Sequence, residues 1–285
     1  MPSPSVNSRF LALRVLVLIS LACMRVSAAS IPHGTVELVA EDQWIAPGHE
    51  SYFGLHFQLE KGWHVYWLNP GDSGQPLHAE WHLPKGLTAG EIEWPAPRRL
   101  GTSTIIDYGY ESEVTLLVPV RGAASLQLNQ PAQLDAELAV LVCREICVPG
   151  KTHVSLSLPI HSMPPEPDGR NRGLFAAARK SLPRAAPPDW TVRAVDADDT
   201  FILVVKSNGR EIRGASFFPL KESQLDNSAP QKLERTAAGF RLTLRKSDQL
   251  LKPIQRLTGV LELPANENYV IDAPVQNAGA GRQAQ

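Results

Sequence analysis

Apolar side chains recur at every second position along much of this chain, which is the pattern of β-strands with one buried face. Phe53, Leu55 and Phe57 show this period, and so do Leu134 and Leu138. The alternating stretches are 51–60, 133–142, 153–160, 200–206, 239–246 and 258–263, with turn motifs such as Asn69-Pro70-Gly71 and Pro149-Gly150 between them. This arrangement is typical of antiparallel sandwiches, so we expect an all-β protein.

A change of composition after residue 160 predicts two β units. The segment that follows is rich in proline and encloses a helical stretch, residues 173–182, which Pro183 ends. The expected divisions are a signal peptide at 1–28, a first β domain at 29–162, a proline-rich linker with a short helix at 163–189, a second β-sandwich domain at 190–275 and a disordered tail at 276–285.

The segment 1–28 has the pattern of a secretory signal peptide. Arg9 and Arg14 supply positive charge around the start of an apolar run at 15–23, and Val26-Ser27-Ala28 offers the small residues of a cleavage site. Because the run is far shorter than the roughly 20 residues that cross a bilayer as a helix, it is not expected to anchor the protein. We expect cleavage at this site and a periplasmic protein.

The charge balance argues against a nucleic-acid surface. The chain has 28 Lys and Arg residues against 29 Asp and Glu residues, a net charge of -1. The signal segment contains three arginines and no acidic residue, so its removal leaves a net charge of -4. No Lys/Arg cluster stands out, and no later apolar run approaches membrane-spanning length. We expect no nucleic-acid partner and no membrane span in the mature chain.

Two cysteines, Cys143 and Cys147, remain once Cys23 is removed with the signal segment. The periplasm allows disulfides to persist, and an even count with no spare thiol predicts that the two pair with each other. A disulfide needs Cα atoms within about 7 Å, whereas four residues of extended strand cover about 13 Å. The chain must therefore turn between them, and the flanking strands predict a hairpin.

The parity of the preceding strand gives the expected direction of Cys143. Alternation places Leu134, Leu138 and Val142 toward the core, so Cys143 belongs to the opposite face together with Glu137. We expect the sulfur pair to face outward at an exposed end of the sheet.

From the residues alone, three roles for the pair stay open. A loop of about five residues stabilises by about 2 kcal/mol in the chain-entropy model, against about 4 kcal/mol for a bridge across about sixty residues, so the pair would be a weak staple. Two thiolates with His153 nearby would suit Cu(I), but the chain has 3 methionines and no second cysteine pair. A tight loop favours the third role, thiol–disulfide exchange, because strain makes a disulfide easier to reduce.

Two other motifs carry reactive residue types but have simpler explanations. The loop Gly71-Asp72-Ser73-Gly74 resembles that of a serine nucleophile, yet such a serine needs a histidine base oriented by a carboxylate, and a turn explains the residues better. His78, Glu80 and His82 share one face of an alternating stretch and offer metal ligands. A solvated strand face explains them more simply, so no metal site is expected.

Four motifs together resemble a known family. They are GWHVYWLNPGDSGQP at 62–76, EWPAPRRL at 93–100, YGYESEVTLLVPV at 108–120 and VLVCREICVPGKT at 140–152. The combination is similar to the periplasmic N-terminal (alpha) domain of DsbD-type thiol:disulfide interchange proteins, and most similar to the ScsB-like branch associated with copper tolerance. The resemblance covers about residues 35–275, because the second β unit also resembles the tandem domain of that branch.

This resemblance implies immunoglobulin-like folds and a redox-active cysteine pair. The second cysteine of the family's pair forms the mixed disulfide with partners, which implies that role for Cys147, with Cys143 as the resolving thiol. Tyr108 and Tyr110 correspond loosely to a shielding loop in the family and are expected to cap or dock the pair. The chemistry needs no metal, nucleotide or flavin, so no cofactor is expected.

The expected partners follow from the same resemblance. Reducing equivalents are expected to come from a separate membrane or thioredoxin-like electron donor and to pass to oxidised periplasmic proteins. A second class of function also stays open, a non-catalytic periplasmic binding module whose cysteines form a structural disulfide or bind Cu(I). Mixed disulfides with partner proteins would separate the two.

Overall fold

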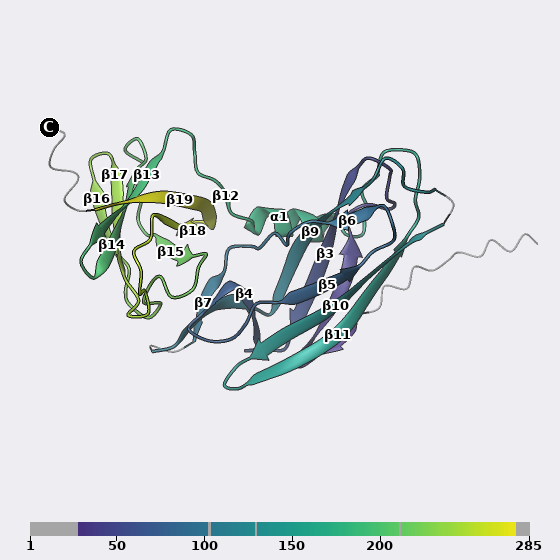
Figure 1. Cartoon of the computed structure of the whole chain (residues 1–285), viewed down its shortest axis with the longest axis horizontal. Coiled ribbons are helices and arrows are strands. Elements are labelled where there is room, and N and C mark those ends of the chain that lie inside the picture. Colours follow the sequence, from purple (N-terminus) through teal and green to yellow (C-terminus); the bar gives the residue numbers. More distant parts are fainter. Residues whose placement is uncertain (1–27, 102–103, 129, 211, 278–285) are drawn as a thin grey trace, which may run out of the picture.

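The computed structural model describes residues 28–101, 104–128, 130–210 and 212–277, with a β unit at each end and the helix α1 between them (Figure 1). Both units are built from paired strands that are mainly antiparallel. The expected all-β class, with two sandwich-like units and a short helix, is therefore confirmed. The predicted signal peptide lies outside the described residues except for Ala28, and the predicted tail does so from residue 278 onward.

Two sheets face each other in the first unit. One sheet has the order β1-β2-β3-β9-β6, with the bounds β1 (Ala29–Ile31), β2 (Gly34–Ala40), β3 (Glu50–Leu59), β9 (Glu113–Gly122) and β6 (Leu87–Ala89). The other has the order β11-β10-β4-β8-β7, with β5 also paired to β10, and its bounds are β11 (Cys147–Leu158), β10 (Ala132–Cys143), β4 (His64–Gly71), β8 (Ile106–Glu111), β7 (Arg98–Gly101) and β5 (His78–His82).

The core of the first unit lies between these sheets and confirms the predicted parity. Phe53, Leu55 and Phe57 enter it from β3, while Leu134 and Val142 enter it from β10. Each such side chain contributes about 1.5–3 kcal/mol on full burial. This inward register fixes which side chains of β10 and β4 can lie on the outer face near the end of the sheet.

The helix α1 (Arg172–Ser181) confirms the short helix predicted at residues 173–182. It packs on the first unit, where Phe175 and Ala178 lie buried against Val39 and Leu117 on the sheet face that points away from the main core. Strands β3 and β9 are therefore buried on both faces, which period-2 alternation alone does not predict.

The second unit has the strand order β15-β18-β19-β13-β14-β17-β16, and β12 pairs with β19. The bounds are β12 (Arg184–Ala185), β13 (Thr191–Ala197), β14 (Thr200–Lys206), β15 (Ser216–Pro219), β16 (Lys232–Thr236), β17 (Gly239–Arg245), β18 (Arg256–Leu263) and β19 (Glu267–Asn277). β19 joins the two halves, because most of its length pairs with β18 and its end pairs with β13. A separate core includes Phe201, Leu242 and Leu261.

The two units pack against each other through apolar and polar contacts. Phe218 of β15 lies in the core cluster of the first unit, with its ring centroid 5.2 Å from that of Tyr108 and 6.4 Å from that of Trp67. Asn69 of β4 donates a 2.8 Å hydrogen bond to the carbonyl oxygen of Pro219. The second unit is thus seated against the ends of β4 and β8.

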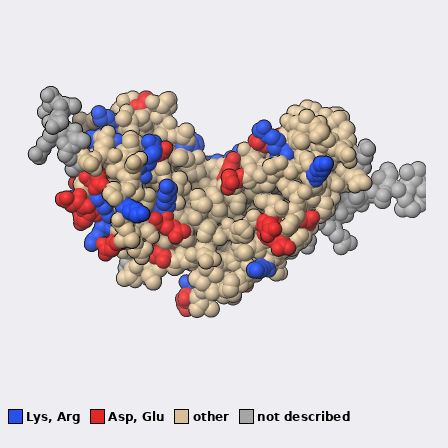
Figure 2. Space-filling view, viewed as in Figure 1, with Lys and Arg blue, Asp and Glu red and all other residues tan. Residues whose placement is uncertain are grey.

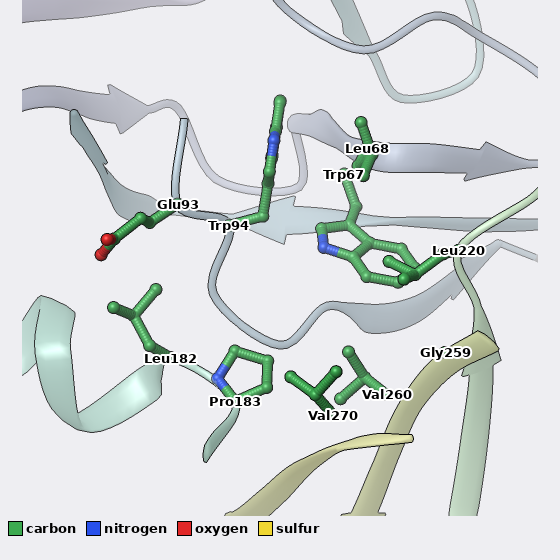
Figure 3. Close-up of a pocket in the computed structure, with 10 residues that line it drawn as sticks. All are labelled: Trp67, Leu68, Glu93, Trp94, Leu182, Pro183, Leu220, Gly259, Val260 and Val270. Carbon is green, nitrogen blue, oxygen red and sulfur yellow. The ribbon is translucent and has the colours of Figure 1, made fainter. Parts of the chain in front are cut away.

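An apolar pocket of about 380 Å³ opens where the two units and the chain after α1 meet (Figure 3). Trp67 and Trp94 line it from the first unit, Pro183 from the connection and Val260 from the second unit. Neither cysteine is among its lining residues, which include one titratable side chain, that of Glu93. The pocket is a feature of the junction and holds no nucleophile.

Charges of both signs are mixed over the face shown in Figure 2, which carries no extended patch of one sign. Such a mixture gives this face little long-range attraction for a polyanion. Within the residues that the structure describes, no helix combines the length and the apolar character needed to cross a membrane.

Candidate functional site

The two cysteines lie at the tip of the β10–β11 hairpin. The strands pair antiparallel along their whole length, from Ala132 opposite Leu158 to Cys143 opposite Cys147. A disulfide joins the two cysteines, whose Cα atoms are 4.1 Å apart. The connection consists of residues 144–146, closed by a 3.1 Å backbone hydrogen bond from the N–H of Arg144 to the carbonyl of Ile146. The hairpin expected from the sequence is therefore present.

The predicted turn at Pro149-Gly150 is wrong. β11 begins at Cys147 and runs through both residues, and Pro149 pairs with Leu141. β11 is the first strand in its sheet order, and an edge strand tolerates a proline because one side of its backbone needs no ladder partner. The cysteines therefore form the last rung of a regular sheet instead of lying in a long loop.

The two sulfur-bearing residues differ in exposure. Cys143 is 2% exposed, whereas Cys147 is exposed and its neighbour Ile146 is 67% exposed. The expectation that Cys143 faces solvent is therefore wrong, although Val142 does enter the core as its parity requires. Cys143 lies in an inner strand, paired with Cys147 on one side and with His64 of β4 on the other, while Cys147 lies on the edge strand.

Tyr66 is the phenol in contact with the pair. Its hydroxyl oxygen lies 3.5 Å from Sγ of Cys147. Its β4 neighbours Val65 and Trp67 enter the core, so Tyr66 lies on the outer face of the sheet. The ring is nevertheless 2% exposed, because the covering loop, which we define as residues 72–76, packs on it.

Gly74 makes this close packing possible. A Cβ atom at this position would lie 2.1 Å from Cζ of Tyr66 and within 2.5 Å of both Cε atoms. Gly74 also has a φ of +83°, a left-handed conformation that glycine adopts without the steric cost paid by other residues. Glycine is therefore required here for both its missing side chain and its backbone freedom.

Burial raises the pKa of the Tyr66 phenol above its usual value, and the nearby Asp107 carboxylate raises it further, against a lowering by a hydrogen bond with Ser73. The phenol is therefore protonated at neutral pH, and its O–H is able to donate to the sulfur of Cys147. A donor near a thiolate stabilises the charged form relative to the thiol.

Tyr66→Phe is expected to make Cys147 of the reduced protein a weaker acid. A hydrogen bond of this kind contributes about 0.5–1.5 kcal/mol, so the pH midpoint for alkylation of Cys147 should rise by up to about one unit. The rate of iodoacetamide alkylation as a function of pH measures this midpoint. Tyr110→Phe is the matched control, because its buried hydroxyl donates to the carbonyl of Pro95. Equal midpoints for the two variants would exclude a role for the Tyr66 hydroxyl.

Asp107 anchors the covering loop. Its Oδ1 atom accepts hydrogen bonds from the Ser73 N–H at 3.1 Å and the Ser73 hydroxyl at 2.8 Å. His64 Nε2 lies 3.8 Å from Oδ2 of Asp107, beyond hydrogen-bond distance. Ser73 therefore donates to a carboxylate and has no histidine base in hydrogen-bond contact, so it is not arranged as a nucleophile.

A stack of side chains holds the positively charged guanidinium of Arg144 in place at the hairpin tip. Cζ of Arg144 lies 5.1 Å from the ring centroid of Trp63, and the His33 ring stacks on Trp63 at a centroid distance of 3.5 Å. His33 Nδ1 is in turn 3.0 Å from Oε2 of Glu60. A cation over an aromatic face contributes about 0.5–1 kcal/mol at an exposed site. The guanidinium is thus held beside the hairpin, next in sequence to Cys143.

The structure places Tyr108 and Tyr110 away from direct contact with the pair. Both are buried on β8, and burial raises the pKa of each phenol. Tyr108 donates to Oδ1 of Asn227 at 2.8 Å, and Tyr110 donates to Pro95. The side chain in contact with the disulfide is that of Tyr66, through its hydroxyl, and this contact was not predicted from the sequence. A docking role for Tyr108 and Tyr110 stays a prediction.

The face with His78, Glu80 and His82 is a separate region. All three side chains are exposed, and Glu80, His82 and Glu137 bring their ligand atoms within 4.8 Å of one another. Among the described residues, Glu80, His82 and Glu137 form the cluster whose side chains could together hold a metal ion, and neither cysteine belongs to it. His153, considered above as a Cu(I) ligand, lies 3.3 Å from Asp135 by its Nε2 atom, six rungs of the hairpin from Cys147.

Comparison with known proteins places the first unit in a family. Residues 35–159 match the family described as "Thiol:disulfide interchange protein DsbD, N-terminal". These residues belong to the DsbD N-terminal family. The match includes the cysteine hairpin, Tyr66 and the covering loop, so every side chain of the site that comes from the first unit lies within it, apart from His33. No curated protein sequence matches the chain.

A solved structure resembles the whole described molecule. The crystal structure of the N-terminal periplasmic domain of ScsB from Proteus mirabilis aligns with a TM-score of 0.65 and 15% sequence identity, covering 85% of this chain and 93% of that one. At this identity the likeness shows the fold, which confirms the immunoglobulin-like class for the tandem arrangement. A marsupial T cell receptor aligns with 11% identity and a TM-score of 0.21, too low to carry an argument.

Proposed function

We propose that this chain performs thiol–disulfide interchange in the periplasm and passes reducing equivalents to partner proteins through Cys143 and Cys147. The observation that carries the proposal is the asymmetry of the pair within a DsbD N-terminal domain. Cys147 is exposed on an edge strand, whereas Cys143 is covered. An exposed sulfur can be attacked by a partner thiolate, and its covered neighbour can resolve the mixed disulfide.

The reducing half of the reaction starts from the oxidised pair. A donor thiolate attacks Sγ of Cys147, the bond to Cys143 breaks, and Cys143 leaves with the electron pair as a thiolate. The second donor thiolate then attacks the donor sulfur of the mixed disulfide and releases Cys147 as a thiolate. Two electrons enter the pair, the donor becomes a disulfide, and the two thiolates take up protons according to the pH.

The second half passes the same two electrons onward. The thiolate of Cys147 attacks an oxidised partner protein, and one partner sulfur leaves with the electron pair. Cys143 then attacks Cys147 in the mixed disulfide, which releases the second partner thiol and restores the disulfide. In this half the hydroxyl of Tyr66 stabilises the attacking thiolate, and the cation of Arg144 adds positive charge next to Cys143.

The partners and the location follow from the family. The electron donor is a separate membrane or thioredoxin-like protein, and the acceptors are oxidised periplasmic proteins. Residues 1–28 direct the chain to the periplasm as a cleaved signal peptide. The second unit, residues 190–275, serves to orient the first unit or to dock partners. It is joined by the linker at 163–189.

The reduction potential of the pair tests this function. Equilibration of the protein with dithiothreitol or glutathione buffers, followed by alkylation of free thiols, should give a potential above about -300 mV. A potential below that value would indicate a bridge that resists reduction and would support the non-catalytic binding module instead. Stoichiometric binding of Cu(I) by the reduced protein, without exchange, would support the metal-binding alternative.

A further inference from the structure

We infer that Asn227 of the second unit is a positioning residue that latches the covering loop against Tyr66, the side chain in contact with Cys147. This inference rests on the proposed function and extends it, because it assigns the second unit a part in controlling the reactivity of Cys147. Asn227 touches neither sulfur. It acts through residues of the first unit that lie between it and the disulfide.

Asn227 is 7% exposed, and its polar groups form hydrogen bonds with residues of the first unit. Its side-chain Nδ2 donates to Oδ1 of Asp72 at 2.8 Å, and its Oδ1 accepts from the hydroxyl of Tyr108 at 2.8 Å. Its backbone carbonyl accepts from Nη2 of Arg99. This one residue of the second unit thus contacts the covering loop and β8 through its side chain and β7 through its backbone carbonyl.

The turn that presents Asn227 is held rigid within the second unit. Oδ1 of Asp226 accepts hydrogen bonds from the N–H of Ser228 at 3.0 Å, its hydroxyl at 2.7 Å and the N–H of Ala229 at 3.1 Å. The N–H of Asp226 is bonded to the carbonyl of Arg245 at 3.0 Å. Because the turn is ordered by its own contacts, little conformational entropy is lost when it meets the first unit.

The path from Asn227 to the sulfur runs through adjacent residues of the covering loop. Asp72, which Asn227 contacts, also accepts the N–H of Ile106 through its other oxygen at 2.8 Å. Two residues further on, Gly74 packs on the ring of Tyr66, whose hydroxyl lies 3.5 Å from Sγ of Cys147. Losing the contact to Asp72 therefore loosens the segment that keeps Tyr66 against the disulfide.

Through these contacts, a partner that binds the second unit can change the reactivity of the disulfide. A partner that displaces the Asn227 turn frees the covering loop and allows Tyr66 to leave Cys147. The equilibrium then shifts toward an open form in which attack on the disulfide is faster. The second unit would thus keep the Tyr66 hydroxyl against Cys147 until a partner arrives.

An exchange of side chains between Asn227 and Asp72 tests the latch. Asn227→Asp places two carboxylates against each other, so the second-order rate constant for reduction of the disulfide by dithiothreitol should rise about tenfold, which corresponds to about 1.4 kcal/mol. Adding Asp72→Asn restores a donor–acceptor pair in the reverse direction. The doubly substituted protein should return to within about twofold of the wild-type rate. Gln249→Ala, which removes an exposed side chain of the second unit bonded to Ser223, should leave the rate unchanged.

The restored rate separates a latch from general damage, because a destabilised second unit would not be repaired by a change in the first. Thermal unfolding of each variant checks that it is folded. A wild-type rate for Asn227→Asp, or a double variant as fast as the single one, would overturn the inference. Failure of the proposed function has a different signature, since the wild-type protein would then show a resistant disulfide whatever the variants do.

Discussion

A Cys143→Ala variant is expected to accumulate mixed disulfides through Cys147, and a Cys147→Ala variant is expected to accumulate none. The reason is the difference in burial, since Cys147 is exposed on the edge strand and Cys143 is 2% exposed. With Cys143 gone, the thiolate of Cys147 attacks a partner disulfide and nothing resolves the adduct. With Cys147 gone, the remaining thiol lies under the cover of its neighbours and cannot be approached in line with a partner's S–S bond.

The measurement is non-reducing electrophoresis of each variant after incubation with oxidised periplasmic extract, followed by mass spectrometry of the adducts. The two single variants are matched controls for each other, because each keeps one thiol in the same hairpin. The double variant Cys143→Ala/Cys147→Ala sets the background. Adducts formed equally by both single variants would mean that exposure does not select the nucleophile. Absence of adducts from both would favour a structural disulfide.

Much of the fold can be predicted from the sequence because the signals are local. The period-2 alternation of β3, β10 and β14 follows from one buried face, and all three strands are found where it predicts them. The pairing of Cys143 with Cys147 follows from the even number of cysteines, and the turn between them follows from their four-residue separation. In both cases the deciding residues are neighbours in the chain.

The features that were missed depend on contacts between distant segments. Cys143 has outward parity yet is covered, because β4 lies next to it. Pro149 reads as a turn residue but is accepted in β11 because that strand is at the edge of the sheet. Parity along β4 places Tyr66 on the outer face, and that signal was available in the sequence. Its meeting with Cys147 depends on strand order, which no local pattern determines.

Gly74→Ala is expected to destabilise the protein more than Gly48→Ala does. Both glycines have positive φ, +83° for Gly74 and +76° for Gly48. Alanine is strained in this conformation, so each variant should lose about 1–2 kcal/mol of unfolding free energy from the backbone alone. A Cβ on Gly48 meets no atom within 4 Å, whereas one on Gly74 would overlap the Tyr66 ring. Forcing an extra methyl group into a packed site costs a further ~1–3 kcal/mol. Urea unfolding of the two variants measures the difference.

The additional loss of stability in Gly74→Ala relative to Gly48→Ala should depend on Tyr66 and should disappear when its ring is removed. In a Tyr66→Ala background the new methyl group at position 74 has room, so Gly74→Ala should then cost no more than Gly48→Ala. An excess that persists in that background would show that the loop, and not the ring, opposes the side chain. The same displacement should also speed reduction of the Cys143–Cys147 disulfide by dithiothreitol in Gly74→Ala, because the shifted ring no longer lies against Cys147. Gly48→Ala should keep the wild-type rate, so the pair of variants links the packing of one glycine to the reactivity of one sulfur.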